Sequence, residues 1–382
     1  MTKIIITTVI SLFTLLTYAQ DGFLIKGKLS GNHEGKIVRL SYPHPAGLKD
    51  PIEDSTFVKN GTFSFKGKIV KDMTRAKLVM SIVGQEIDPS DYTRYYEIDQ
   101  QHFILENTTF LVTGKDLKQA KIKGGEAQAD YNALRAQLKP LEEKMQPLSQ
   151  KIIQYGREKN EKGREELYPK VRKIAEEKSK VMETFVLEHP DSYVSLSILN
   201  DQGGVQNPNF ESQFNSLSER VKTSDLGKEL TTQLRATQTV EVGNPALDFV
   251  MNDTEGKPIA LSSLRGKYVF LDFWASWCGP CRSENPHVKK AYEKLKGDNF
   301  EIIAVSLDNK KEHWLKAIKE DNLPWIHVSD LKGTKNEAAL KYGVTGIPQN
   351  FLISPDGTIL AKDFRGEDLD KRLMEYMDKQ HQ

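Results

Sequence analysis

Residues 268–282 read YVFLDFWASWCGPCR, an apolar run that ends in two cysteines separated by two residues. The run from Val269 to Phe273 predicts a buried strand, and Pro280 suits the first turn of a following helix, where no backbone donor is needed. Cys278 would then stand at a helix N-terminus, where free N–H groups and the helix dipole stabilise a thiolate. A free cysteine has a pKa of about 8.5, and such settings lower it to about 3.5–7.5. The stretch therefore indicates a redox-active dithiol, Cys278 and Cys281.

A metal site is the alternative interpretation of two closely spaced cysteines. Structural zinc needs four ligands, and the chain holds no second cysteine pair and no His-x₃₋₅-His. His287, His313 and His327 keep no ligand spacing to the pair. We therefore expect no metal and no cofactor.

Strand-like and helix-like segments alternate from this stretch to residue 377, which predicts an α/β domain with a central sheet. Asp356-Gly357 separates the last two predicted strands, as expected for a tight hairpin. The predicted strands cover residues 268–273, 301–307, 350–353 and 359–362, and the predicted helices cover residues 280–295, 310–320, 336–341 and 368–377.

Residues 126–239 are rich in Glu, Lys, Gln, Leu and Ala. A linker is predicted where this region ends, at residues 237–245. Leu134, Leu138 and Leu141 keep helical spacing. Pro140 and Pro147 are expected to break or kink the first helix. The apolar repeat is not sustained over several heptads, so we favour a helical hairpin or spacer over a dimerising coiled coil.

Residues 21–115 contain short apolar or alternating runs separated by turn signals, a pattern typical of β structure. Asn60-Gly61 lies between two such runs and predicts a hairpin. We expect a small antiparallel sandwich or barrel.

The N-terminus has the features of a secretory signal peptide. Lys3 precedes the apolar run IIITTVISLFTLL (residues 4–16), and Ala19 offers a cleavage point. The run is shorter than the roughly 20 residues that span a bilayer. The predicted organisation is a signal peptide at residues 1–19, a β domain at 20–118, a helical domain at 119–236 and an α/β domain at 237–382.

Composition adds bounds on function. The 382 residues are too many for one compact domain by the usual size of domains, and 38% hydrophobic residues suffice for real cores. The 54 basic and 53 acidic residues leave a net charge of +1, so no basic excess suggests a nucleic-acid partner. Two cysteines in a single pair do not form the scattered framework of structural disulfides.

Two motifs in the last third of the chain carry a family resemblance. DFWASWCGPCR at residues 272–282 resembles the active-site signature of thioredoxins, and its continuation to Pro286 resembles the ResA/TlpA-like branch of envelope thioredoxins. GVTGIP at residues 343–348 resembles the loop that carries the family's cis-proline. The likeness covers about residues 242–377. Residues 21–115 resemble, by pattern alone, a β domain of unknown function found ahead of such domains in Bacteroidetes-type envelope proteins.

The resemblance implies a role for each residue that it matches. Cys278 would be the exposed nucleophile, and Cys281, more buried, would resolve the mixed disulfide. Pro348 would be cis and face the dithiol, while the backbone of Ile347 would pair with the substrate chain. Trp277, Gly279 and Pro280 would complete the surface around the dithiol.

Two acidic residues are further candidates. Asp272 matches the buried acid that takes or relays the proton of Cys281, and the alternative is a polar residue satisfied near a strand end. Glu284 lies three residues after Cys281 on the same helical face, and the resemblance gives it a role in tuning thiol protonation. The alternative for Glu284 is a solvated helix charge.

The expected function is that of an envelope thiol–disulfide oxidoreductase, which the resemblance makes a reductant of protein disulfides. Disulfide-containing envelope proteins, apocytochromes among them, would be substrates, and a membrane thiol donor would recharge the dithiol. Isomerase, oxidase, thiol peroxidase and partner-binding adaptor remain alternatives, although the Pro-x-x-x-Thr-x-x stretch of peroxidases does not precede Cys278. The oligomeric state stays open, a homodimer included.

Overall fold

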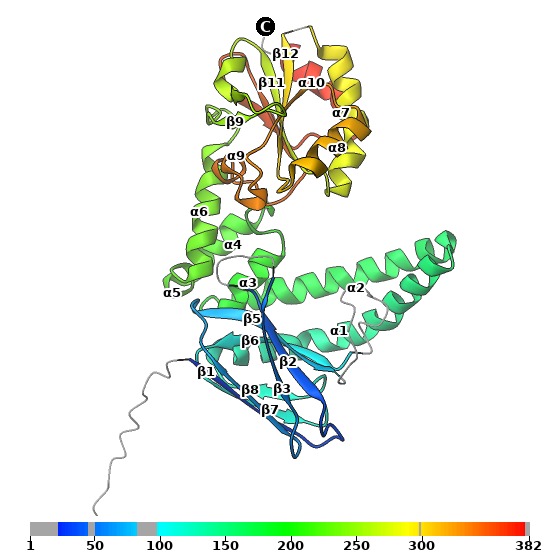
Figure 1. Ribbon diagram of the computed structural model, residues 1–382, viewed down its shortest axis with the longest axis vertical. Coiled ribbons are helices and arrows are strands. Elements are labelled where there is room, and N and C mark those ends of the chain that lie inside the picture. Colours follow the sequence, from blue (N-terminus) through cyan, green and yellow to red (C-terminus); the bar gives the residue numbers. More distant parts are fainter. Residues whose placement is uncertain (1–21, 45–49, 82–97, 298, 379–382) are drawn as a thin grey trace, which may run out of the picture. The chain divides into compact units, whose positions relative to one another are not determined.

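The computed structural model describes residues 22–44, 50–81, 98–297 and 299–378 (Figure 1). By its packing the chain divides into two compact units, Met1–Val194 and Ser195–Gln382. The signal peptide predicted at residues 1–19 lies outside the described residues. The domain boundaries predicted at residues 118 and 236 stay a prediction.

The first unit contains two four-stranded sheets that enclose one apolar core, as the alternating sequence pattern predicts. In β1 every second residue is buried, because successive side chains point to opposite faces of a strand. The first sheet has the order β4-β1-β7-β8 and the second the order β3-β2-β5-β6. The strands are β1 (Phe23–Leu29), β2 (Ile37–Tyr42), β3 (Ile52–Phe57), β4 (Thr62–Gly67), β5 (Met73–Ser81), β6 (Gln100–Glu106), β7 (Thr109–Gly114) and β8 (Lys121–Lys123).

The pairing of these strands differs from the prediction in two respects. The β1–β7 pair is parallel, so the sandwich is not purely antiparallel. Asn60 and Gly61 have φ values of 51° and 71° and form the predicted tight turn. The strands beside that turn nevertheless belong to different sheets, because β3 pairs with β2 whereas β4 pairs with β1. The turn is therefore a corner between sheets, which lets Phe63 and Phe65 enter the core.

Two long antiparallel helices, α1 (Glu126–Arg157) and α2 (Glu161–Glu188), follow the sheets and form the predicted hairpin. Gln128 attaches α1 to the sandwich, since its Oε1 accepts a hydrogen bond from the Ile104 N–H at 2.7 Å. Of the predicted break or kink at Pro140 and Pro147, the break does not occur, because α1 continues through both residues. Each proline removes one backbone donor, and the packing of the long helix on its neighbours outweighs that local loss.

The second unit begins with short helices and continues into an α/β domain. The helical segments are α3 (Tyr193–Asp201, which starts two residues before the division), η1 (Gly204–Gln206), α4 (Phe210–Ser216), α5 (Glu219–Lys222) and α6 (Asp225–Thr239). Ser224 caps α6 by accepting a hydrogen bond from the Gly227 N–H at 3.2 Å.

The α/β domain has a five-stranded sheet of order β13-β12-β11-β14-β15, which confirms the predicted thioredoxin-like class. β11 pairs in parallel with β12 and antiparallel with β14, and β15 closes the sheet through the turn at Gly357. Its elements are β9 (Val250–Asn252), β10 (Pro258–Ala260), η2 (Leu261–Leu264), β11 (Tyr268–Trp274), α7 (Gly279–Leu295), β12 (Phe300–Ser306), α8 (Lys311–Asp321), β13 (Ile326–Val328), η3 (Gly333–Lys335), α9 (Glu337–Lys341), β14 (Gln349–Ile353), β15 (Ile359–Lys362) and α10 (Leu369–Asp378).

The central strand of this sheet positions the candidate site. All seven residues of β11 are buried, as expected for a strand covered on both faces. β11 runs directly into the two cysteines and α7, while the antiparallel strand β14 begins just after Pro348. The sheet therefore brings the two sequence motifs to the same edge. No helix within the described ranges has both the length and the apolar character that crossing a membrane requires.

Candidate active site

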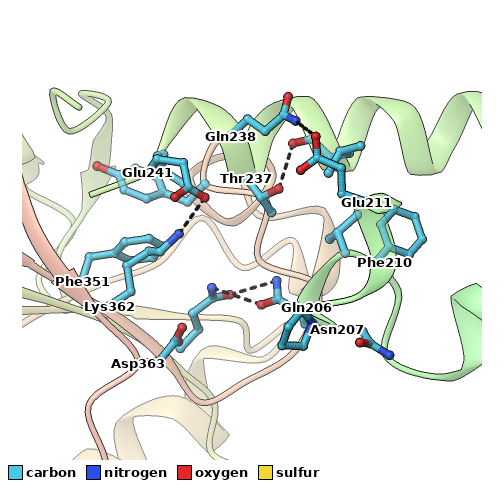
Figure 2. A pocket seen from close by; sticks show the side chains of 16 residues that line it. Gln206, Asn207, Phe210, Glu211, Thr237, Gln238, Glu241, Phe351, Lys362 and Asp363 are labelled. Atoms are coloured by element: carbon cyan, nitrogen blue, oxygen red, sulfur yellow. Dashed lines mark hydrogen bonds and ion pairs between the residues drawn. The ribbon is translucent and has the colours of Figure 1, made fainter. Parts of the chain in front are cut away.

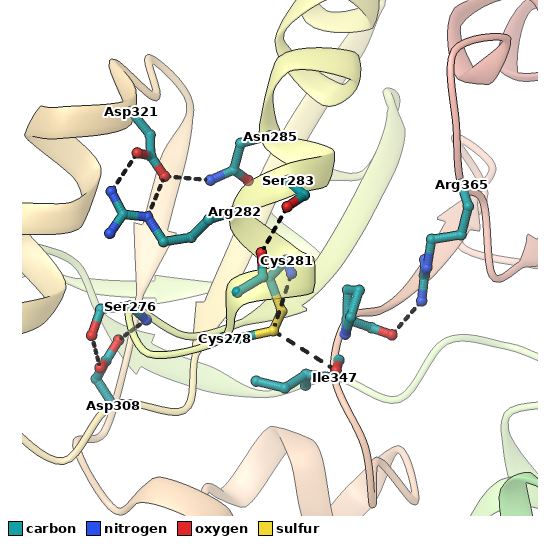
Figure 3. Close-up of a disulfide and its surroundings, with 12 residues drawn as sticks. Ser276, Cys278, Cys281, Arg282, Ser283, Asn285, Asp308, Asp321, Ile347 and Arg365 are labelled. Carbon is teal, nitrogen blue, oxygen red and sulfur yellow. Dashed lines mark hydrogen bonds and ion pairs between the residues drawn. A yellow bond between two sulfur atoms is a disulfide. The ribbon is translucent and has the colours of Figure 1, made fainter. Parts of the chain in front are cut away.

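The two cysteines stand at the start of α7 and form a disulfide in this structure (Figure 3). Cys278 is the N-cap of α7, and its Sγ accepts a hydrogen bond from the Cys281 backbone N–H at 3.1 Å. Pro280 occupies the first turn, where it removes no intrahelical hydrogen bond. When the disulfide is reduced, the same N–H and the helix dipole are placed to stabilise a thiolate on Cys278.

Both cysteines are buried in the disulfide form, so the expectation that Cys278 is exposed does not hold. Cys278 is 5% exposed and Cys281 is 3% exposed, so the expected contrast between an exposed and a buried cysteine is small. Ile347 lies against Cys278, with its carbonyl oxygen 3.8 Å from the Cys278 Sγ. Ile347 and the start of α7 therefore border the Cys278 sulfur.

The loop at residues 343–348, hereafter the cis-proline loop, faces the disulfide. The Ile347–Pro348 peptide bond is cis, and Ile347 and Pro348 are both partly buried. The backbone of Ile347 beside Cys278 is the arrangement that the resemblance implies for pairing with an extended substrate chain. The structure thus brings the two distant motifs, 272–282 and 343–348, to one place.

The surface beside the disulfide carries an exposed aromatic side chain and two glycines with open space beside them. Trp277 is 61% exposed, and a Cβ added to Gly279 or to Gly346 would meet no atom within 4 Å. Trp274, in contrast, is buried in the core, with its ring 5.7 Å from that of His327. Of the two tryptophans, only Trp277 can contact a docked partner.

Asp272 is buried in the middle of β11, on the strand that leads to the cysteines. Burial raises its pKa from 3.8 to about 7, because a carboxylate is poorly solvated there. The positive charge of Arg365 and a hydrogen bond with Asn350 act in the opposite direction, whereas the charge of Glu284 raises the pKa further. A carboxyl group that titrates near neutral pH can both accept and return a proton.

Glu284 lies in the first turns of α7 and is partly buried. Its Oε2 accepts a hydrogen bond from the backbone N–H of Gly366 at 2.9 Å. Glu284 is therefore anchored to the loop after β15, and the alternative of a freely solvated helix charge does not fit this contact.

Sequence reasoning missed Asp308, which holds the turn before the cysteines. The buried carboxylate accepts the Ser276 N–H at 2.9 Å and the Ser276 hydroxyl at 2.5 Å (Figure 3). The Ser306 hydroxyl donates to Asp308 at 2.8 Å. Asp308 follows β12, about 30 residues from Cys278, and no local pattern marks it as part of the site.

Arg365 was also missed. It lies in the loop after β15 and donates from Nη2 to the Pro348 carbonyl and from Nη1 to the Phe364 carbonyl, the latter at 2.6 Å. The Phe364 backbone is held in turn by Asn350, whose side chain accepts from its N–H at 2.8 Å and donates to its carbonyl at 3.1 Å. The residues around the cis-proline loop thus form a connected polar network.

Arg282 ties α7 to the end of α8. Its guanidinium donates to both carboxylate oxygens of Asp321, at 2.9 and 2.6 Å, and to Glu320 at 3.1 Å. Asn285 donates to the same Asp321 carboxylate at 2.8 Å. The first turn of α7 is therefore fixed from the side of α8.

A cavity of about 240 Å³ lies within the second unit, next to the start of β14 (Figure 2). Gln206 of η1 donates to the Gly343 carbonyl at 3.2 Å, and its amide also pairs with that of Gln349. Lys362 and Glu241 form an ion pair of 3.1 Å at one wall. Because Gly343 begins the cis-proline loop and Gln349 follows it, the short helical segment supports both ends of that loop.

Comparisons with known proteins match the two parts of the chain separately. The model of the AhpC/TSA family matches residues 242–362, and the model described as a domain of unknown function (DUF4369) matches residues 23–131.

Within the described residues, no group of three or more His, Cys, Asp or Glu side chains is placed to hold a metal ion.

Curated relatives share the last part of the chain. Thiol-disulfide oxidoreductase ResA of Bacillus thuringiensis subsp. konkukian is 37% identical over 142 residues, which are 37% of this chain and 80% of the relative. The protein of the same name from Bacillus subtilis is 34% identical over 140 residues, 76% of its length. The solved thioredoxin domain of a thiol-disulfide oxidoreductase from Bacteroides vulgatus is 35% identical, covering 36% of this chain and 97% of that domain, with a TM-score of 0.34.

The fold and the paired cysteines define a thioredoxin-like protein with a Cys-x-x-Cys redox site. The chain belongs to the ResA family of thiol-disulfide oxidoreductases, its residues 242–362 match the AhpC/TSA family model, and ahead of them it carries a β domain of unknown function. It is accordingly a thiol-disulfide oxidoreductase.

Proposed function

We propose that this chain reduces disulfide bonds in other proteins through a cycle of Cys278 and Cys281. The observation that carries the proposal is the placement of Cys278 at the N-cap of α7, with its Sγ 3.8 Å from the Ile347 carbonyl. A sulfur that can be stabilised as a thiolate lies beside a backbone edge on which an extended chain can dock.

The cycle balances without a cofactor. The Cys278 thiolate attacks one sulfur of the substrate disulfide and releases the other as a thiolate, which leaves a mixed disulfide. Cys281 then loses its proton to the Asp272 carboxylate and attacks the Cys278 Sγ, which releases the second substrate thiolate. The substrate has gained two electrons and leaves as two thiolates, which take up one proton from Asp272 and one from solvent, and the enzyme has become the disulfide seen here.

Each active-site residue has a role in this proposal. Cys278 is the nucleophile, Cys281 is the resolving thiol and Asp272 is the proton acceptor. Glu284 biases the proton affinity of Asp272, and Ile347 and Pro348 supply the docking edge. Trp277, Gly279 and Pro280 form the adjoining surface.

The proposed setting is the cell envelope. Its support is the signal-like segment at residues 1–19 and the resemblance to envelope thioredoxins. There, disulfide-containing proteins, apocytochromes among them, are the proposed substrates, and a membrane thiol donor returns the dithiol to the reduced state. A homodimer remains a prediction.

The reduction potential of the Cys278–Cys281 couple, measured on the mature protein in graded glutathione or dithiothreitol buffers, tests the direction. A value near about −270 mV, that of thioredoxin, supports a reductant. A value near about −120 mV, that of a strong oxidant, contradicts it. Turnover of insulin disulfides is the companion assay, with Cys278→Ser as the inactive control. Cys281→Ser should accumulate the mixed disulfide, detected as a mass increase.

A further inference from the structure

Arg365 touches the cis-proline loop directly. Its Nη2 donates to the carbonyl of Pro348, the residue on the C-terminal side of the cis bond (Figure 3). Its Nη1 donates to the Phe364 carbonyl at 2.6 Å, which fixes the direction of the guanidinium. Arg365, which follows Pro348 by 17 residues, therefore holds the loop on which a substrate would dock.

The same side chain acts on Asp272, the buried acid on the strand that leads to the dithiol. The charge of Arg365 lowers the pKa of Asp272, against the larger effect of burial. The other groups that act on Asp272 are Asn350 of β14, which lowers that pKa by hydrogen bonding, and Glu284 of α7, which raises it. Glu284 is bound through its Oε2 to the N–H of Gly366, the residue next to Arg365.

We propose that Arg365 is a positioning residue that fastens the cis-proline loop, and that it couples substrate docking on this loop to the protonation of Asp272. The inference rests on the proposed function. A chain that pairs with Ile347 pulls on the adjoining Pro348 carbonyl, and the guanidinium bound to that carbonyl must follow. Coulomb energy depends on distance, so the proton affinity of Asp272 changes at the step in which Cys281 must lose its proton.

Two substitutions separate the two contributions of this side chain. Arg365→Met removes both the charge and the hydrogen bonds, whereas Arg365→Lys keeps the charge but loses the fork geometry that reaches two carbonyls. The matched control is Arg372→Met on α10. Arg372 lies over the Phe364 ring at 5.0 Å and belongs to neither the loop contact nor the groups that act on Asp272.

The first measurement is a pH titration of the Asp272 carboxyl carbon by NMR in the oxidised, full-length mature protein, with Asp272→Asn identifying the signal. The wild-type midpoint is expected near 7. Arg365→Met should move it upward, because removal of a nearby cation favours the neutral acid, and Arg365→Lys should stay closer to wild type. A shift of equal size in Arg365→Met and Arg372→Met would overturn the assignment.

The second measurement tests the coupling itself. In a Cys281→Ser background, a peptide thiol is joined to Cys278 as a mixed disulfide, and the Asp272 midpoint is compared with and without the peptide. The midpoint should move on peptide attachment when Arg365 is present and stay in place when residue 365 is Met. An equal shift in both backgrounds would overturn the coupling.

Insulin reduction supplies the kinetic readout. Arg365→Lys and Arg365→Met should both raise KM by about tenfold, the size expected for loss of a charge-assisted hydrogen bond, and Arg372→Met should not. An unchanged KM in Arg365→Lys would contradict the loop contact. If Arg365→Met does not fold, as judged by its thermal transition, Arg365→Gln, which also removes the charge, takes its place in each comparison. A wild-type protein that does not reduce insulin removes the proposed function, while the two titrations still decide the role of Arg365.

Discussion

Glu284 Oε2 accepts a hydrogen bond from the Gly366 N–H at 2.9 Å, which joins the first turns of α7 to the loop after β15. That loop also contains Arg365, which binds the Pro348 carbonyl. The dithiol helix and the cis-proline loop are therefore held by neighbouring residues of one segment, and a change in either bond should affect the other.

Glu284→Gln should lower the pKa of Asp272, because it removes the negative charge that raises that pKa and retains an oxygen that can accept from Gly366. Glu284→Ala should also lose about 1–2 kcal/mol of unfolding free energy, since the Gly366 N–H is left without its partner. Urea denaturation of the oxidised proteins measures the second effect. Equal stability of the two variants would show that the hydrogen bond contributes nothing.

Asp272→Asn should slow turnover at pH 8 by at least about 100-fold, the lower end of what a positioned general base contributes. The wild-type rate should rise as pH increases through about 7, because Asp272 must be ionised to accept the proton of Cys281. The rate–pH profile of insulin reduction measures this inflection. If the inflection persists in Asp272→Asn, it reports the titration of another group.

Asp272 should also make the oxidised protein less stable as pH rises. Its folded-state pKa of about 7 lies above the unfolded value near 3.8, so the folded state binds the proton more tightly. The free energy of unfolding should fall between about pH 4 and pH 7, by at most about 4 kcal/mol. Asp272→Asn should lack this slope. Denaturant titrations at pH 4.5 and 7.5 compare the two proteins, and parallel pH dependences would contradict the prediction.

Asp308→Asn should destabilise the turn that precedes the cysteines. The amide retains one acceptor oxygen but places donors against Ser276 and Ser306, which donate to the carboxylate in the native protein. A loss of about 2 kcal/mol is expected, against about 1 kcal/mol for Ser276→Ala, which removes a single hydroxyl. Thermal unfolding ranks the variants, and the reverse order would reject this account of the turn.

Arg282→Met removes the ion pair between Arg282 and Asp321 and should destabilise the protein by about 1 kcal/mol at pH 7. The loss is small because the pair is partly exposed and solvent screens its charges. Hydrogen bonding and the charge of Arg282 lower the pKa of Asp321 below 3.8. The ion pair therefore stabilises the folded protein fully above pH 3.8, and this stabilisation is lost as pH falls through the lower pKa that Asp321 has in the folded state. Lys316→Met, which removes an exposed partner of Glu320, is the control. If Arg282→Met is still less stable than the wild-type protein by the same amount at pH 2, the ion pair is not the source of the difference.

The local patterns in the sequence predicted most of the fold. The strand before Cys278, the α/β alternation and the β-rich front part all appear in the structure, because periodicity reports which faces are buried. The turn at Asn60-Gly61 was predicted, but the sheets to which its two strands belong were not. Turn chemistry fixes the local path of the chain, whereas the choice of partner strand depends on which side of the core each strand reaches.

The sequence by itself determined the dithiol, its place at a helix N-terminus and the presence of a second motif at residues 343–348, since each depends on contiguous residues. Only the tertiary structure decided that Asp308, Arg365 and Gly366 contact that site. These residues lie 32, 17 and 82 positions from their hydrogen-bond partners Ser276, Pro348 and Glu284. Such contacts arise from the order of strands in the sheet, which places β12, β14 and the loop after β15 around the end of β11, and no local pattern encodes that order.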